Sequence, residues 1–122
     1  MYEDIGDILE YGNITDKEAV VLCNKIIEES ILENDAEILE AMYHTIFIGV
    51  TNHKISDKLA VSTIIKLSDK FNEEVSDYII TILAYTGKEE YIEMIRQIGK
   101  KYTNLDINEA ITELNALLKQ KN

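Results

Sequence analysis

Residues 14–20 read ITDKEAV and residues 55–61 read ISDKLAV, so one short pattern occurs twice at an interval of 41 residues. The likeness continues at the same interval in three more pairs: Lys25 and Lys66, Ile26 and Leu67, and Ile38 and Ile79. Self-similarity at a period of about 20–50 residues is typical of stacked helical units, each of which is stable only against its neighbours. The repeat therefore predicts an architecture, and it specifies no reaction.

The composition favours one all-α domain. A chain of 122 residues is long enough to bury a core and leaves little room for a second domain. It contains no proline and only five glycines, so little in it interrupts helices or forms β-turns. We therefore expect a single helical-repeat domain over residues 1–122.

The spacing of apolar residues divides this domain into an N-terminal helix and three helix pairs. Residues 1–13 are expected to form a capping helix, followed by repeats at residues 14–54, 55–87 and 88–122. Short turns between successive helices make those helices antiparallel. The expected fold is a short right-handed stack of antiparallel helix pairs.

In the first repeat, Thr15 followed by Glu18 predicts a capping box, in which each side chain accepts from the other residue's backbone N–H. This helix is expected to end near Glu33. Either Asn34 or Asp35 is expected to cap the next helix, which continues to about residue 52. The apolar stripe of the first helix comprises Ala19, Val20, Leu22, Cys23, Ile26, Ile27 and Ile31. That of the second comprises Ile38, Leu39, Met42, Ile46, Gly49 and Val50, where Gly49 allows a close approach of a neighbouring helix.

The second repeat is expected to begin with Ser56 as the cap of its first helix. Asn72 is expected to cap its second helix, and Gly87 to end it. Asp106 is expected to open the last helix of the chain. The first helix of the second repeat would carry Leu59, Ala60, Ile64, Leu67 and Phe71. Four side chains are predicted to be buried: Phe47, Ile64, Ile79 and Leu83.

The duplicated cap-and-stripe pattern and the segment ILAYTG at residues 82–87 resemble the HEAT-like repeats of α-helical solenoids. The resemblance covers about residues 14–119, and it implies that the second helix of each pair lines the concave side of the stack. Carboxylates together with tyrosine are typical of a protein interface. The alternative is an ordinary solvated face. The positions predicted to bind a partner are Glu37, Glu40, His44, Glu74, Asp77, Tyr78, Glu109 and Glu113.

The chain carries 23 acidic and 12 basic residues, a formal net charge of -11. The electric field of so large a negative charge repels nucleic acid and anionic membranes and speeds association with basic partners. We therefore expect a basic protein partner, and neither nucleic acid nor a membrane. The alternative is that the charges only keep the protein in solution. No basic and apolar leader follows Met1, and no apolar run reaches about 18 residues, so we expect a cytoplasmic protein.

No residue pattern predicts a catalytic, metal or cofactor site. His44 and His53 lack the companion ligands of an H-E-x-x-H motif. Cys23, the only cysteine, falls in an apolar stripe and is most simply a small buried hydrophobe. The five glycines are isolated, which excludes phosphate-binding loops. We therefore expect a protein that is not an enzyme, with no metal and no cofactor.

A small, acidic, cysteine-poor HEAT-like domain is similar to the immunity proteins of bacterial toxin–immunity systems, including those of contact-dependent growth inhibition. That resemblance rests on size, net charge and architecture. It implies that the chain neutralises a cognate toxin, often a nuclease, by covering its basic active-site cleft with an acidic surface. Two other classes stay open. One is a scaffold or adaptor that binds a peptide or a subunit of a larger assembly, and the other is a HEAT-like lyase or repair enzyme.

Overall fold

The computed structural model describes residues 1–121 and confirms the all-α prediction. Over these residues the chain forms seven α-helices, three short 3₁₀ turns and no strand. The α-helices are α1 (Tyr2–Tyr11), α2 (Asp16–Ser30), α3 (Ala36–Asn52), α4 (Val61–Lys66), α5 (Glu73–Tyr85), α6 (Ile92–Lys101) and α7 (Ile107–Lys121). The 3₁₀ turns are η1 (Ser56–Lys58), η2 (Ser68–Lys70) and η3 (Glu89–Tyr91). Asn122, with which the predicted third repeat ends, lies outside the described residues.

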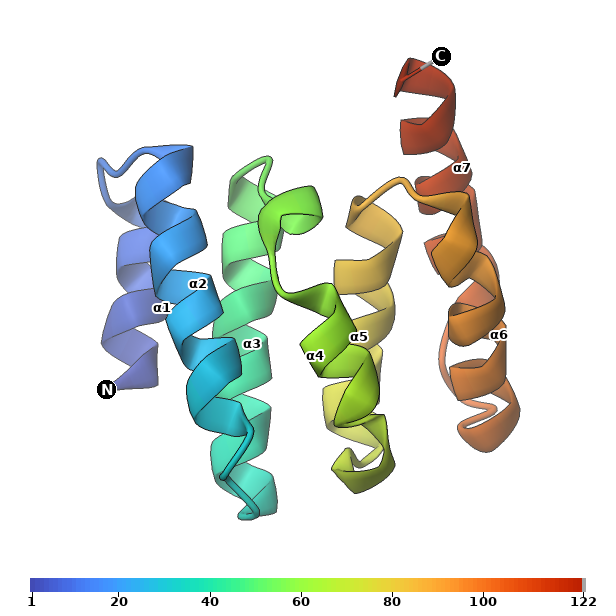
Figure 1. The fold of residues 1–122 in the computed structure, drawn as a ribbon, viewed down its shortest axis with the longest axis horizontal. Helices are drawn as coiled ribbons and strands as arrows, with labels where there is room; N and C mark the ends of the chain where they lie inside the picture. The colour runs from blue at the N-terminus through green and yellow to red at the C-terminus, as the bar shows by residue number, and fades with distance from the viewer. Residues whose placement is uncertain (122) are drawn as a thin grey trace.

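The helices lie in two layers (Figure 1). α1, α3, α5 and α7 run in one direction, and α2, α4 and α6 lie in front of them and run in the opposite direction. The most extensive helix contacts join α3 to α1 and to α5, and α5 to α7. The connections between successive helices are short, so each helix has to run back beside the one before it.

Side-chain caps begin four of the helices at the positions that the sequence predicted. Thr15 Oγ1 accepts from the N–H of Glu18 at 3.1 Å, and the Glu18 carboxylate accepts from the N–H of Thr15 at 3.1 Å. Of the two candidates before α3, Asp35 is the cap. Asn72 caps α5, and Asp106 caps the start of α7. Each cap satisfies an N–H group that the helix leaves unpaired.

The first helix of the second repeat is broken, contrary to the prediction. Ser56 does not cap a long helix; it begins η1, and α4 starts only at Val61. The side chain of Asn24, on α2, accounts for the break. Its oxygen accepts from the N–H of Ala60 at 2.9 Å, and its amide donates to the carbonyl of Lys58 at 3.3 Å. A continuous helix needs those backbone groups for its own hydrogen bonds, so this tertiary contact competes with the helix.

Two apolar side chains assigned to the core, Ile31 and Ile38, are exposed, and Phe47, which was predicted to be buried, is only partly covered. α2 ends before Ile31 rather than near Glu33, so Ile31 lies in a turn and is 45% exposed. Ile38 is 40% exposed because α1 is shorter than α3 and begins level with Thr45, which leaves the first turns of α3 uncovered (Figure 1). Phe47 is half-buried at the edge of the α3–α5 contact. The stripe pattern was correct for these helices, but their neighbours do not extend over all of it.

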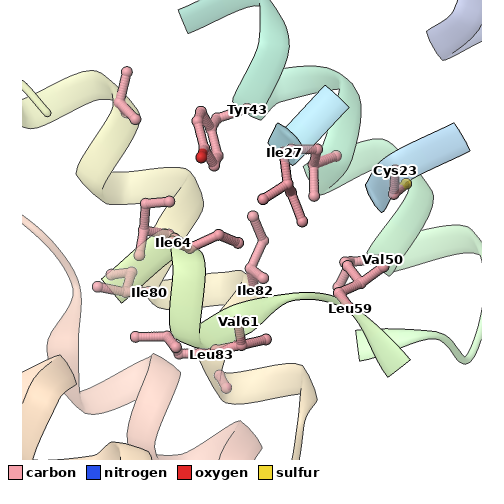
Figure 2. Packing of buried hydrophobic residues seen from close by; sticks show 14 of the residues in the cluster. Cys23, Ile27, Tyr43, Val50, Leu59, Val61, Ile64, Ile80, Ile82 and Leu83 are labelled. Atoms are coloured by element: carbon pink, nitrogen blue, oxygen red, sulfur yellow. The ribbon is translucent and has the colours of Figure 1, made fainter. Parts of the chain in front are cut away.

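The core lies between the two layers, where side chains from α2, α3, α4 and α5 converge around Tyr43 (Figure 2). Ile64, Ile79 and Leu83 are buried there, as predicted. The hydroxyl of Tyr43 is 2.8 Å from Ser30 Oγ, which satisfies a polar group that the core would otherwise leave unpaired. Burial raises the pKa of Tyr43 to about 12, so the phenol stays neutral.

Gly49 permits the close approach that the sequence predicted. A β-carbon at this position would lie 2.7 Å from Cys23 Sγ of α2, 3.5 Å from a methyl of Leu9 in α1 and 3.6 Å from a methyl of Ile55. Cys23, Leu9 and Ile55 are all buried, so none of them has open space to move into. α1, α2 and the segment at Ile55 therefore all approach α3 at Gly49, the one residue of α3 that has no side chain.

We expect Gly49→Ala to lower the free energy of unfolding by about 1–3 kcal/mol, because the added methyl overpacks the contact with Cys23. The double variant Gly49→Ala/Cys23→Ala should recover part of that loss, because it removes the sulfur that the methyl meets. Urea unfolding followed by circular dichroism measures both values.

Gly6→Ala is the matched control. A β-carbon at Gly6 meets only the end of the Ile48 side chain, at 3.1 Å, and alanine is favoured over glycine inside a helix. The stability of this variant should therefore hold or rise. If the effects of Gly49→Ala and Cys23→Ala simply add, the two side chains are not in the predicted conflict.

Candidate functional site

Three neighbouring helices carry the residues that the sequence assigned to partner binding. This set, called here the acidic face, comprises Glu37, Glu40 and His44 on α3, Glu74, Asp77 and Tyr78 on α5, and Glu109 and Glu113 on α7. Spacings of three and four residues place the members from each helix on one side of it. Because α3, α5 and α7 lie side by side in one layer, the three stripes are adjacent. Glu40 and Tyr78 are half-buried, and the other members are exposed.

A hollow of about 260 Å³ lies in this face, between α3, α5 and α7. Four carboxylates border it: Asp77, Asp106, Glu109 and Glu113. Its other lining residues are Phe47, Thr51, Ile80, Thr81, Ala84, Tyr85 and Ala110. No lysine or arginine is among the described residues that line it. Negative charge beside aromatic rings is a combination that suits the ammonium or guanidinium group of a cationic side chain.

Aromatic rings from α3 and α5 meet next to the hollow. The ring centroids of His44 and Tyr78 are 5.2 Å apart, and those of Phe47 and Tyr78 are 5.3 Å apart. Burial raises the pKa of Tyr78, and the carboxylates of Glu40 and Asp77 raise it further. Carboxylates from α3 and α5 therefore both raise the pKa of Tyr78. The acidic face thus contains a cluster of aromatic rings beside its carboxylates.

No carboxylate of the acidic face pairs with a cationic side chain among residues 1–120, the residues whose side chains the structure describes. Over these residues the one acid–base contact within ion-pair distance joins His53 Nδ1 and Asp16 Oδ1 at 2.8 Å. His53 follows α3 rather than lying on it, and its Nε2 is 2.9 Å from the carbonyl oxygen of Leu9. This histidine therefore fastens the end of α3 to α1 and α2. The charges of the acidic face stay without a cationic partner in the part of the chain that the structure describes.

The hollow includes only some of the predicted residues. Asp77, Glu109 and Glu113 border it. Glu37 and Glu74 lie beyond it, in the first turns of α3 and α5. They belong to the same stripes but not to the same depression.

Most of the residues that line the hollow were not among those predicted to bind a partner; Phe47, Thr51, Tyr85 and Asp106 are examples. Phe47 was assigned to the core, and Asp106 only to a helix cap. A periodic signal was present, because His44, Phe47 and Thr51 continue one stripe of α3, and residues 106, 109 and 113 continue one stripe of α7. The two stripes become neighbours only through tertiary packing, which a local sequence pattern does not reveal.

Cys23 lies outside the acidic face, on α2. Cys23 is fully buried, and burial raises the pKa of its thiol to about 12, so the sulfur is protonated and out of reach at neutral pH. No group of three or more His, Cys, Asp or Glu side chains in the described chain is arranged to hold a metal ion. No helix among these residues is both long and apolar enough to cross a membrane.

Comparisons with protein-family models, with curated proteins and with solved structures gave no match. The acidic face with its hollow is therefore the structural feature of this chain from which a function can be inferred.

We expect Cys23 in the folded protein to react with dithionitrobenzoate about three orders of magnitude more slowly than in guanidinium, because reaction requires unfolding to expose the thiol. The release of the coloured thiolate measures both rates. Val21→Cys is the control, because Val21 is 64% exposed and a thiol there should react at once. Fast reaction of Cys23 without denaturant would contradict its burial and would make Cys23 a candidate nucleophile again.

Proposed function

We propose that this chain is a non-enzymatic binding protein whose acidic face captures a basic protein partner. One observation carries the proposal: the hollow between α3, α5 and α7 is bordered by four carboxylates and lined by no cationic side chain. Carboxylates without internal ion pairs attract a partner's lysine or arginine from a distance and select the orientation in which it arrives. The rings of Phe47 and Tyr85 then offer contact area to the captured side chain.

The mechanism proposed is that of an immunity protein in a bacterial toxin–immunity system. The chain would act in the cytoplasm and neutralise a cognate toxin, a nuclease, by covering its basic active-site cleft. Such a cleft is basic because it binds the phosphates of nucleic acid. A row of carboxylates on packed helices offers negative charge where those phosphates would sit. The net charge of -11 and the resemblance to HEAT-like immunity proteins support this mechanism.

The same proposal assigns the fold to the HEAT-like stacks, with a right-handed succession of helix pairs. In such a stack α3, α5 and α7 are the second helices of their pairs and line the concave side. The observed two layers and the shared direction of α3, α5 and α7 support this assignment. The acidic face would then be a continuous inner surface.

An adaptor is the second candidate, because the acidic face extends over three helices and also suits an extended peptide or a subunit of a larger assembly. The two functions have different consequences for the partner. An immunity protein abolishes the nuclease activity of its toxin, whereas an adaptor leaves the activity of its partner in place.

We expect the triple variant Asp77→Lys/Glu109→Lys/Glu113→Lys, at three exposed positions that border the hollow, to associate with the basic partner about tenfold or more slowly, because it removes the negative charge that steers encounter. The difference should shrink as salt rises to a few tenths molar, about where charges are screened over a few ångströms. The partner to use is the protein encoded directly upstream of this gene, with association measured by biolayer interferometry. A nuclease assay on the same mixture separates the immunity protein from the adaptor.

The control is Asp57→Lys/Asp69→Lys/Glu93→Lys, which changes the net charge equally at exposed positions outside the acidic face. This control variant should associate with the partner at nearly the rate of the original protein. Both variants should remain within about 1 kcal/mol of the original in unfolding, because exposed charges contribute little to stability. An undiminished rate for the acidic-face variant, or an equal loss in both variants, would refute the role of the face.

A further inference from the structure

The turn between α2 and α3 displays large apolar side chains that the core does not use. Leu32 is 88% exposed, Ile31 45% and Ile38 40%. A single exposed leucine is ordinary on a protein surface. Three such side chains lie within eight residues of the chain, and exposed apolar side chains that gather in one part of a surface mark interaction sites. These three residues are called here the turn patch.

The turn patch is held in place by hydrogen bonds from within the fold. The ammonium group of Lys70, in η2, donates to the carbonyl oxygens of Ser30 at 2.7 Å, Ile31 at 3.0 Å and Glu33 at 2.7 Å. The Glu33 carboxylate accepts from the next two backbone N–H groups, each at 3.1 Å. The backbone of the turn is therefore fixed before any partner arrives. A surface that is already ordered loses little conformational entropy on binding.

The turn patch lies in an acidic stretch of the chain. Residues 28–38 contain no lysine or arginine and five acids: Glu28, Glu29, Glu33, Asp35 and Glu37. The ammonium group of Lys70 beside them is occupied by three backbone carbonyl groups. The charges of Glu29 and Glu33 extend to α1, where they add to the effect of burial in raising the pKa of Tyr2. An apolar centre within an acidic rim is complementary to apolar side chains flanked by lysine or arginine.

We infer that the turn patch docks a basic amphipathic segment of a partner protein. The apolar side chains of that segment cover Ile31, Leu32 and Ile38, and its cationic side chains meet the surrounding carboxylates. A second copy of this chain fits poorly, because two acidic rims would face each other. An anionic lipid surface is repelled for the same reason. The patch lies at the end of the α2–α3 pair, outside the hollow, so this inference does not depend on the function proposed for the hollow.

The test is a titration of ¹⁵N-labelled protein with a synthetic helical peptide made of leucine and lysine. We expect the largest amide chemical-shift changes at residues 28–38. Leu32→Ser should weaken binding about tenfold or more, because it removes the most exposed apolar contact of the patch. Val21→Ser is the matched control, since Val21 is 64% exposed on α2 but lies outside the patch, and it should bind like the original.

A second peptide, with alanine in place of leucine and the same charge, separates apolar contact from charge attraction. It should bind about tenfold or more weakly than the leucine peptide. Equal binding of the two peptides, equal losses in the two serine variants, or no shift at all would overturn the inference. Shifts at the turn that depend on protein concentration without peptide would show self-association and would overturn it too. Shifts confined to α5 and α7 would overturn it while leaving the proposed function in place.

Discussion

The absence of a side chain at Gly49 is the constraint on which the first half of the fold depends. At this residue α3 approaches Cys23 of α2, Leu9 of α1 and Ile55 of the segment that leads into η1. A helix that is covered from several directions must be apolar around most of its circumference, which explains the run IFIGV at residues 46–50. A β-carbon at Gly49 would lie in ordinary contact with Leu9 and Ile55 but only 2.7 Å from the buried Cys23 Sγ, so α2 and α3 would have to move apart. With α3 fixed by them, one side of the helix is left for solvent, and that side carries the acidic stripe.

The charges that the fold uses lie at helix ends. Glu18, Asp35 and Asp106 act at helix N-termini, where backbone N–H groups and the helix dipole favour negative charge. Lys70 acts at the opposite kind of end, where the last carbonyls of α2 accept from its ammonium group. Glu37, Glu74 and Glu109 of the acidic face also lie in first turns, where the helix dipole favours them. Glu40, Asp77 and Glu113 lie farther along their helices and meet no cationic partner in the described structure, so their mutual repulsion opposes folding. This cost to stability supports the role in binding proposed for these three carboxylates.

Features decided by residues three or four apart could be predicted from the sequence. The capping box of Thr15 and Glu18, the caps at Asp35 and Asn72, and the stripes of each helix belong to this class. The break before α4 could not be predicted, because Asn24 acts on backbone groups 34 and 36 residues farther along the chain. Ile31 and Ile38 sit at core positions of their stripes, but Ile31 lies beyond the end of α2, and the cover over Ile38 depends on where α1 begins. The members of the acidic face follow from periodicity, whereas the hollow requires α3, α5 and α7 to be neighbours. Phe47 was misassigned because an aromatic residue inside an apolar run is usually buried.

The break also explains how the two copies of the repeat diverged without loss of the core. Glu18 of the first copy corresponds to Leu59 of the second, so the second copy cannot close a capping box. A lost cap costs about 1 kcal/mol, whereas burying a leucine contributes about 1.5–3 kcal/mol. Leu59 is buried, so the exchange favours the broken helix even before the two hydrogen bonds from Asn24 are counted. The irregularity stays in the layer of α2, α4 and α6. α3 and α5 contact each other directly, the rings of His44 and Tyr78 lie side by side, and the acidic stripes of the two helices are therefore adjacent despite the break.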